Sequence, residues 1–472
     1  MRPEVKRYFA QQAWIDGAWA VDVVLSVDDL GAWCDVQKNS PPDVWRSATQ
    51  LNGAVLPGLV NAHSHAFQRA IVGLTEDRAI DTAAGDDDDF WSWRSRMYSA
   101  ANRITPPQLE AIATFLYGEL LLGGYTHVCE FHYLHNDLDG KPYADPVEMS
   151  QALVRAAETV GIGITLLPTL YMRSGFGAAG LREDQCRFAS SPERVLRLVE
   201  AIAPIGGLVN VGVAVHSLRA ADIGAVGEVA EAARRQNLAV HIHIAEQMQE
   251  VTDCLAHHGR RPVEWLLERA RVDSNWNLVH ATHTTTAELA GIRESGASIV
   301  ICPSTEANLG DGVFDYPGYA GLRGMWSVGS DSHVTRSWPE ELRLLEYSQR
   351  LTHCKRNIAA RFSEQSSSAA ALFESALAGG RPATGQTVGS IAIGNRADFL
   401  VLDHDALAQV GVPPAQRLAA LVFSSPTAAF EQVFVAGKQV VNHGRIVGGT
   451  QASALWPELA RNFNTVMSEL WR

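Results

Sequence analysis

The sequence contains few cysteines, and they lack the spacing that binds metals or builds a disulfide framework. All six are scattered along the 472 residues, without a Cys-x-x-Cys motif. They are Cys34, Cys129, Cys186, Cys254, Cys302 and Cys354. Such spacing favours reduced thiols in a cytosol over structural disulfides or a thiolate metal site.

Basic residues are also scarce relative to acidic ones. Lys and Arg together number 39 against 52 Asp and Glu, which gives a formal net charge of -13. Nucleic-acid surfaces need clustered Lys and Arg, so this composition argues against a nucleic-acid partner. It also means that an anionic substrate would need positive charge gathered at its binding site.

Long apolar segments are absent as well. No stretch approaches the uninterrupted apolar run of a membrane span, and the first residues have no apolar stretch of signal-peptide length. We therefore expect a cytoplasmic protein without a membrane partner. With 46% apolar and 19% charged residues, the composition is that of a globular chain long enough for two or three domains.

Short β-branched runs alternate with amphipathic helical stretches, such as 107–122 and 223–235, over much of the chain. Eight strands are predicted, at residues 54–60, 126–131, 162–170, 209–215, 239–244, 276–280, 298–302 and 325–329. Strands that alternate with helices imply an α/β fold of parallel βαβ units, and eight units close into a (β/α)8 TIM barrel. A doubly wound open sheet fits the same pattern, but the positions of the polar residues argue against it.

The flanks of this region read differently. They contain short strand-like runs separated by Gly, Asp and Pro. We expect residues 1–57 and 388–450 to form one small β-sandwich domain, residues 58–387 the barrel, and residues 451–472 a C-terminal helical tail. Four consecutive aspartates at residues 86–89 predict a solvated loop, because adjacent carboxylates diverge and do not converge on a cation.

A His-x-His motif ends the first predicted strand. Strand side chains alternate with a period of two, so His63 and His65 point the same way, into the mouth of the barrel. Two imidazoles on one rigid element make half of a zinc site. Taken alone, such a pair is more typical of hydrogen-bonded loop histidines.

Three further strand ends carry side chains of the same kinds. His243 lies at the end of the fifth strand, His280 ends the sixth, and Asp331 follows the eighth. The carboxyl ends of barrel strands share one rim, where the active sites of such barrels lie. Core packing does not account for this arrangement, so the constellation predicts a metal site.

This order of residues resembles the amidohydrolase superfamily over nearly the whole chain. The resemblance implies a zinc ion held by His63, His65, His243 and Asp331, with His280 beside it. Members with two metals supply a bridging Lys or Glu at the end of strand four. Neither residue stands there in this sequence, so one ion is expected.

The resemblance also implies a mechanism. Glu246, three residues after His243, matches the proton-transferring acid of the deaminase branch. Zinc lowers the pKa of water to about 7. Asp331 would accept the proton of that water, His280 would orient or polarise the reacting centre, and Glu246 would protonate the leaving nitrogen. A helix-capping carboxylate is the alternative role for Glu246.

Several segments are more specifically similar to the formiminoglutamate deiminases. They are residues 63–70, 90–94, 130–133, 176–177, 216–219, 241–247 and 304–312. The similarity implies that Arg94 and Arg219 clamp two substrate carboxylates, and that Gln68, Tyr133 and His216 make the other polar contacts. An arginine suits this role because its planar fork binds a carboxylate bidentately. We expect Arg94 in a long loop that folds over the barrel mouth.

The reaction implied by this similarity is hydrolysis of N-formimino-L-glutamate to N-formyl-L-glutamate and ammonia in histidine degradation. A homodimer is implied as well. Two alternatives remain. One is another mononuclear zinc aminohydrolase that acts on a purine, pyrimidine or triazine ring, although a flat neutral ring would not require two arginines. The other is a catalytically silent barrel with a binding or assembly role, although every expected ligand is present.

Overall fold

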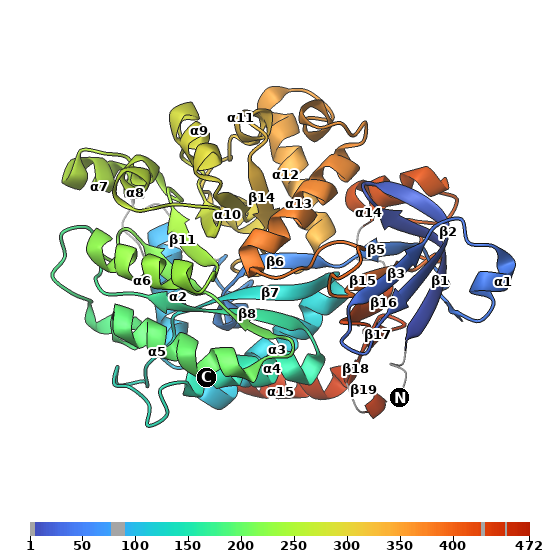
Figure 1. Cartoon of the computed structure of the whole chain (residues 1–472). Helices are drawn as coiled ribbons and strands as arrows, with labels where there is room; N and C mark the ends of the chain where they lie inside the picture. Colours follow the sequence, from blue (N-terminus) through green and yellow to red (C-terminus); the bar gives the residue numbers. More distant parts are fainter. Residues whose placement is uncertain (1–4, 77–89, 426–429, 449–450) are drawn as a thin grey trace.

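The computed structural model describes residues 5–76, 90–425, 430–448 and 451–472. The solvated loop predicted at residues 86–89 lies outside them. Two bodies of β-structure lie side by side, a barrel wrapped by helices and a sheet at one flank (Figure 1). The predicted α/β class, with a barrel and a small β-domain built from both chain ends, is confirmed.

Eight parallel strands form the barrel in the order of the chain. They are β6 (Leu59–Ser64), β7 (Tyr125–His132), β8 (Gly163–Leu170), β10 (Val213–Ser217), β11 (Val240–Ile244), β12 (Trp276–His280), β13 (Ser298–Ile301) and β14 (Met325–Val328). A short strand, β9 (Val209–Val211), pairs with β8 off this path. Their residues are almost all buried, as expected for parallel strands covered by helices.

The first and last barrel strands meet beside the predicted metal ligands. Ser64 and Asp331 form a parallel bridge. The amide of His65 donates to the carbonyl oxygen of Asp331 (3.2 Å), and the amide of Asp331 donates to that of His63 (3.0 Å). Closure of the barrel therefore fixes the backbone that holds these side chains.

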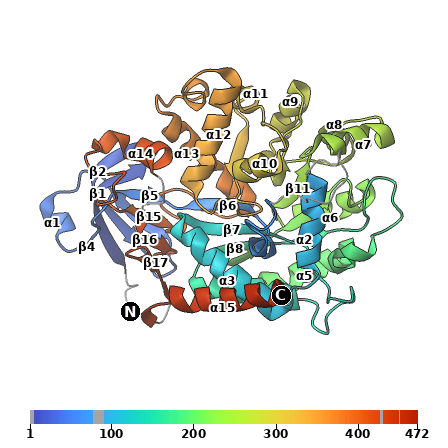
Figure 2. The same cartoon turned by 180° about the vertical axis from the view of Figure 1, so that it is seen from behind.

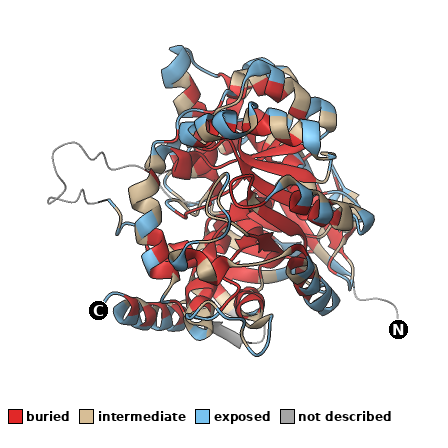
Figure 3. Ribbon diagram, turned by 90° about the vertical axis from the view of Figure 1, so that its left-hand side faces the viewer, coloured by how far each residue is buried: buried red, intermediate tan, exposed pale blue. Residues whose placement is uncertain are grey.

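Helices surround the strands with their outer sides exposed (Figure 3). After α1 (Pro42–Trp45), the α-helices are α2 (Phe90–Ala101), α3 (Pro106–Leu122), α4 (Glu148–Val160), α5 (Pro192–Ile202), α6 (Ile223–Arg235), α7 (Met248–His258), α8 (Pro262–Arg269), α9 (Thr286–Ser295), α10 (Pro303–Leu309), α11 (Tyr316–Gly321), α12 (Trp338–His353), α13 (Ser368–Thr384), α14 (Arg417–Ser424) and α15 (Trp456–Leu470). Short 3-10 turns lie between them, including η1 (Ala66–Ala70) and η2 (Glu183–Phe188).

Both chain ends contribute to one mixed ten-stranded sheet. Its strands are β1 (Lys6–Ile15), β2 (Ala18–Val27), β3 (Trp33–Gln37), β4 (Thr49–Gln50), β5 (Val55–Pro57), β15 (Phe399–Leu402), β16 (Phe430–Val435), β17 (Lys438–Asn442), β18 (Arg445–Gly448) and β19 (Gln451–Ala454). Tyr8, Phe399 and Phe434 pack together in a core separate from that of the barrel, with Phe399 and Phe434 stacked at 4.2 Å. A short helix, α1 (Pro42–Trp45), lies at the sheet's edge.

Two predicted strands are each divided in the structure. Residues 54–60 contribute to β5 in the flanking sheet and to β6 in the barrel. Gly58 makes the transition, since its amide donates to the carbonyl oxygen of Asp398 (3.0 Å) and a Cβ there would lie 2.4 Å from the Thr126 side chain. Residues 209–215 likewise divide at Gly212, whose amide donates to the carbonyl oxygen of Leu166 (3.0 Å).

The C-terminal helix α15 packs along α3 on the outside of the barrel (Figure 2). Phe115 of α3 stacks on Phe463 (4.4 Å) and Trp456 (4.8 Å) of α15. Among the described residues, no helix combines the length and apolar character needed to cross a membrane.

Candidate metal centre and substrate pocket

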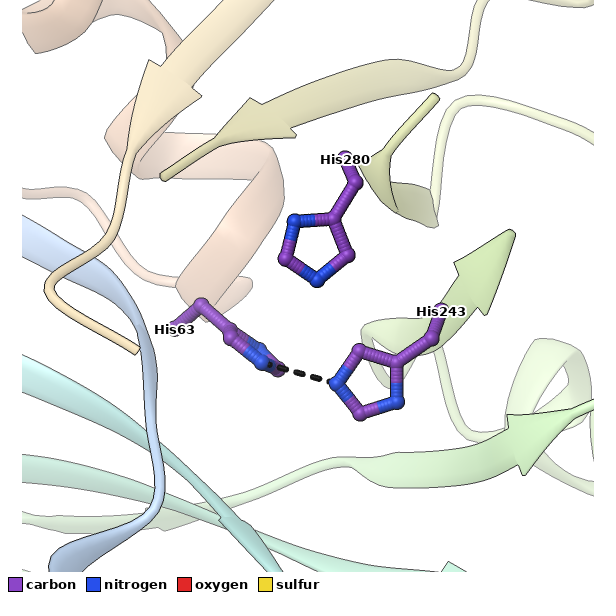
Figure 4. A group of neighbouring side chains, drawn as sticks. All are labelled: His63, His243 and His280. Atoms are coloured by element: carbon purple, nitrogen blue, oxygen red, sulfur yellow. Dashed lines mark hydrogen bonds between the residues drawn. The ribbon is translucent and has the colours of Figure 1, made fainter. Parts of the chain in front are cut away.

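Four strand ends bring the predicted ligands together. His63 lies in β6, His243 in β11 and His280 at the end of β12, and their imidazole rings face a common space (Figure 4). His65 and Asp331 follow directly after β6 and shortly after β14. All five side chains are buried. His280 and Asp331 both adopt positive φ angles, 70° and 47°, which are strained for such residues and occur preferentially at functional sites.

Three imidazole nitrogens converge. The Nε2 atom of His63 lies 3.1 Å from that of His65 and 2.9 Å from that of His243, and the last two are 3.3 Å apart. A tetrahedral zinc ion with bonds of about 2.0–2.1 Å separates its nitrogen ligands by roughly 3.3 Å. The three atoms are thus spaced for a shared ion.

Hydrogen bonds at the other ring nitrogens fix the tautomers of two of these imidazoles. His65 Nδ1 lies 2.9 Å from the carbonyl oxygen of Phe131, and His243 Nδ1 lies 2.8 Å from that of His216. A carbonyl oxygen only accepts, so each Nδ1 donates, and each Nε2 of a neutral ring bears a lone pair. Burial lowers the pKa of both histidines and keeps them neutral. Their facing lone pairs are an arrangement that a cation between them stabilises.

A carboxylate completes this group. Asp331 Oδ1 lies 3.4 Å from His65 Nε2 and 3.5 Å from His63 Nε2. His63, His65 and Asp331 offer ligand atoms within 4.8 Å of one another, as do His63, His243 and His280. The donor set of three imidazoles and one carboxylate suits zinc.

His280 is surrounded by carboxylates as well as by the other imidazoles. Its Nε2 atom is 3.7 Å from Glu246 Oε1 and 3.8 Å from Asp331 Oδ2, and its Nδ1 atom is 3.3 Å from Glu306 Oε1. Burial lowers the pKa of His280, but these carboxylates outweigh burial and raise it to about 10. Burial also raises the pKa of Glu246 to about 7, so this side chain can both take up and release a proton near neutral pH.

Two arginines, Arg94 and Arg219, line the same pocket. The Trp91 ring lies 4.2 Å from Arg94 Cζ and 5.9 Å from Arg219 Cζ. Burial and the positive charge of Arg219 lower the pKa of Arg94, while Arg219 Nε has Glu250 at 3.8 Å. Paired cations of this kind make an anion-binding site.

The predicted location of Arg94 is wrong, because it lies on helix α2 and not in a loop. The segment that follows the first barrel strand becomes helical from Phe90, and Phe90, Met97 and Tyr98 form its buried face. Arg94 lines the pocket together with the candidate metal ligands His65, His243 and Asp331. Its side chain is therefore mounted on a regular element.

The other predicted polar contacts line this pocket too. Gln68 Nε2 donates to the Tyr133 hydroxyl (3.3 Å), and Gln68 Oε1 is buried with no hydrogen-bond partner among the residues that the structure describes. The His216 ring packs against Tyr133 and Tyr171. His241, one layer deeper, lies outside the pocket and contacts the carbonyl oxygen of Ala383 through Nε2 (2.8 Å).

Comparison with known proteins establishes the family. A model of the amidohydrolase family matches residues 54–440. This chain belongs to that family. Over 464 residues it is 44% identical to a formimidoylglutamate deiminase from Pseudomonas aeruginosa, spanning 98% of this chain and 99% of the relative. This amidohydrolase is thus a hydrolase of C–N bonds.

Solved structures agree in fold. An amidohydrolase from Brucella melitensis is 39% identical, with a TM-score of 0.89 over 99% of this chain and 100% of that chain. An adenosine deaminase from Xanthomonas campestris with bound zinc has a TM-score of 0.78 at 20% identity, over 98% of each chain. At that identity the likeness shows the fold alone.

The site of this amidohydrolase includes acids to which sequence reasoning gave no role. Glu306 contacts His280, Glu250 lies beside Arg219, and Asp311 belongs to a cluster with Glu246 and His280. Glu306 and Asp311 fall within residues 304–312, which were noted as similar to a known family. That similarity was the available signal, because the local sequence pattern does not show which acids beyond the strand ends turn inward.

Gly329 packs directly against His63, so a larger residue at this position should disturb the site. At Gly329 an added Cβ would lie 2.6 Å from His63 Cβ and 2.8 Å from its amide nitrogen. We expect Gly329→Ala to displace His63, to destabilise the fold by about 1–3 kcal/mol and to weaken zinc affinity at least about 10-fold. Thermal unfolding and zinc titration test this. Gly227→Ala on α6, where a Cβ meets nothing within 4 Å, is the control: it should leave zinc affinity unchanged and should not lower stability, because alanine is the better helix former. Unaltered zinc affinity in Gly329→Ala would contradict the prediction.

Proposed function

We propose that this chain is a zinc-dependent deiminase that hydrolyses N-formimino-L-glutamate to N-formyl-L-glutamate and ammonia in histidine degradation. The observation that supports it most is the single pocket in which paired guanidinium groups face a metal-ligand cluster. The cluster suits hydrolysis, and the arginines suit a dicarboxylate. The deiminase relative from Pseudomonas aeruginosa supports the same reaction.

We propose one zinc ion per chain. His63, His65, His243 and Asp331 would hold it through the Nε2 and carboxylate atoms that converge in the pocket. When bound, zinc supplies a water molecule whose pKa is lowered from 15.7 to about 7, so that hydroxide is available at neutral pH.

The acids and His280 would move the protons of the reaction. Asp331 Oδ2 lies 3.8 Å from His280 Nε2 and would accept the proton of the attacking water. Oxygen then adds to the formimino carbon, and His280 stabilises the negative charge that develops near it. Glu246 would pass the remaining proton of the water to the terminal nitrogen, the carbon–nitrogen bond breaks, and ammonia leaves while the oxygen remains as the formyl carbonyl.

Arg94 and Arg219 would bind the two carboxylates of the glutamate moiety. Each guanidinium group can donate two parallel hydrogen bonds to a carboxylate. The shared packing on Trp91 holds both forks in place before the substrate arrives. Gln68 Oε1, Tyr133 and His216 would contribute the remaining polar contacts along the pocket.

Removal of one of the two arginines should slow the reaction of the substrate without changing the zinc content. Arg94→Ala removes a charge-assisted contact, so we expect kcat/KM for N-formimino-L-glutamate to fall about 10- to 100-fold. Zinc content should stay unchanged, because Arg94 projects from α2 and not from a barrel strand. Steady-state kinetics with metal analysis measure both. Arg103→Ala, at an exposed position just beyond α2, is the control. An unchanged kcat/KM in Arg94→Ala would contradict the proposal that Arg94 binds a substrate carboxylate.

The direct test of the activity is ammonia release from N-formimino-L-glutamate, run beside guanine, cytosine and S-adenosylhomocysteine. We expect release only from the formimino compound. Release from a ring substrate instead would favour the other candidate, a mononuclear zinc aminohydrolase of purine, pyrimidine or triazine rings. An 8-oxoguanine deaminase from Pseudomonas aeruginosa, 28% identical over 405 residues (84% of this chain and 83% of that one), gives that alternative some support.

We also propose a cytoplasmic homodimer as the working form. Within each chain, residues 1–57 with 388–450, residues 58–387 and residues 451–472 would be the β-domain, the barrel domain and the helical tail. Sedimentation of the purified protein tests the dimer, and a monomer at micromolar concentration would argue against it.

A further inference from the structure

Groups of both charge signs line the pocket. Its cations are Arg94 and Arg219, and its acids are Glu246 and Asp331. Carboxylates surround His280, namely Glu246 (3.7 Å), Glu306 (3.3 Å) and Asp331 (3.8 Å). A ligand that carries both anionic groups and a cation matches this lining.

Asp311 is a further acid, beside Glu246 and His280, and only one oxygen of its carboxylate has a hydrogen-bond partner among the described residues. It is 4% exposed. Its amide donates to the carbonyl oxygen of Glu306 (2.9 Å), and its own carbonyl oxygen lies 2.7 Å from His283 Nε2. Its Oδ1 atom accepts a hydrogen bond from Gln247 Nε2, whereas Oδ2 is buried and finds no hydrogen-bond partner within the described part of the chain. The residue is therefore held in place while one of its oxygens stays unsatisfied.

The position of this carboxylate is close to the reacting centre. Glu246, His280 and Asp311 each offer a ligand atom within 4.8 Å of the others. Gln247, which holds Asp311, follows Glu246 directly in the chain. A buried, unpaired acceptor is costly, and a second carboxylate nearby adds like-charge repulsion. A cationic ligand with N–H donors removes both costs.

We propose that Asp311 and Glu246 together bind the amidinium group of the substrate, so that Asp311 selects a cationic amidine over a neutral amide. This inference rests on the proposed function. An amidinium group is planar, bears one positive charge over two nitrogens and donates N–H on each side. Glu246 meets the nitrogen that leaves, and Asp311 accepts from the group through its free oxygen. Charge-assisted hydrogen bonds of this kind are about twice as strong as neutral ones.

The substrate and its product provide a matched pair of ligands for the test. N-formimino-L-glutamate and N-formyl-L-glutamate share both carboxylates but differ in charge at the formimino or formyl group. We expect Asp311→Asn to raise KM for N-formimino-L-glutamate and to lower kcat/KM about 10- to 100-fold. The inhibition constant of N-formyl-L-glutamate should change less than about twofold. Its formyl group is neutral, so removal of the negative charge of Asp311 takes away no ion-pair contact to it.

Asp315→Asn is the matched control. Asp315 is exposed, and its side chain accepts from the amide of Gly318 at the start of α11, which asparagine can also do. Asp311→Ser, measured in the same way, serves in case the asparagine variant folds poorly. Zinc per chain is determined for every variant.

Three results would overturn the inference. They are an unchanged KM, equal weakening of substrate and product, or a loss of zinc in Asp311→Asn, which would make Asp311 a metal ligand. Failure of the proposed function looks different. In that case the wild-type protein itself would release no ammonia from N-formimino-L-glutamate.

Discussion

Replacing Glu246 with glutamine is expected to lower kcat for N-formimino-L-glutamate about 10²- to 10⁴-fold, the range for loss of general acid–base catalysis. The amide keeps the size of the side chain but cannot carry a proton from water to the leaving nitrogen. Glu246 is buried, with Oε1 3.7 Å from His280 Nε2 and no role in the imidazole cluster. Zinc content should therefore remain that of the wild type.

The measurement is steady-state ammonia release together with metal analysis. Glu264→Gln on α8, where the side chain is 49% exposed, is the control and should keep full activity. A kcat within twofold of the wild type in Glu246→Gln would show that another group transfers the proton. In that event the helix-capping role becomes the better account of Glu246.

Removal of one imidazole from the cluster should abolish metal binding at working concentrations. His243→Ala takes away the Nε2 atom that lies 2.9 Å from that of His63 and 3.3 Å from that of His65. Loss of an outer contact to a ligand costs about 10- to 100-fold in affinity, so loss of the ligand itself should cost more than about 100-fold. Ammonia release should fall to near the background rate.

Zinc titration and activity at saturating substrate measure this effect. His257→Ala, an exposed histidine on α7, is the control and should bind one zinc ion normally. Full zinc occupancy in His243→Ala would mean that the ion is held elsewhere. The group formed by Glu246, His280 and Asp311 would then be the next site to examine.

Much of the barrel and of its rim follows from sequence periodicity. Alternation along a strand placed His63 and His65 on one side, and their Nε2 atoms indeed lie 3.1 Å apart. The carboxyl ends of parallel strands share one rim, which brought His243 and Asp331 to the same place. These are short-range rules, and they hold because the pleat and the βαβ connection leave little choice.

Other features depend on tertiary contacts that no local pattern contains. The division of residues 54–60 follows from the close approach of Gly58 to Thr126, which come from different parts of the chain. The helix that carries Arg94 could have been predicted from the sequence, because the apolar residues Phe90, Met97 and Tyr98 recur at helical spacing. The inward turn of Asp311 depends on Gln247 and His283, which lie far from it in sequence.

The junction between β6 and β14 determines when, during folding, the candidate metal site becomes complete. Ribosomal synthesis delivers His63 and His65 with the first barrel strand and Asp331 only after the last. Because Asp331 bridges Ser64 at that junction, the complete ligand set exists only once the eighth strand has docked. A chain that ends before the eighth strand contains the three imidazoles but not the carboxylate of Asp331. In the proposed zinc enzyme, the complete set of four ligands therefore forms only with the last step of barrel closure, so that metal affinity reports on that step.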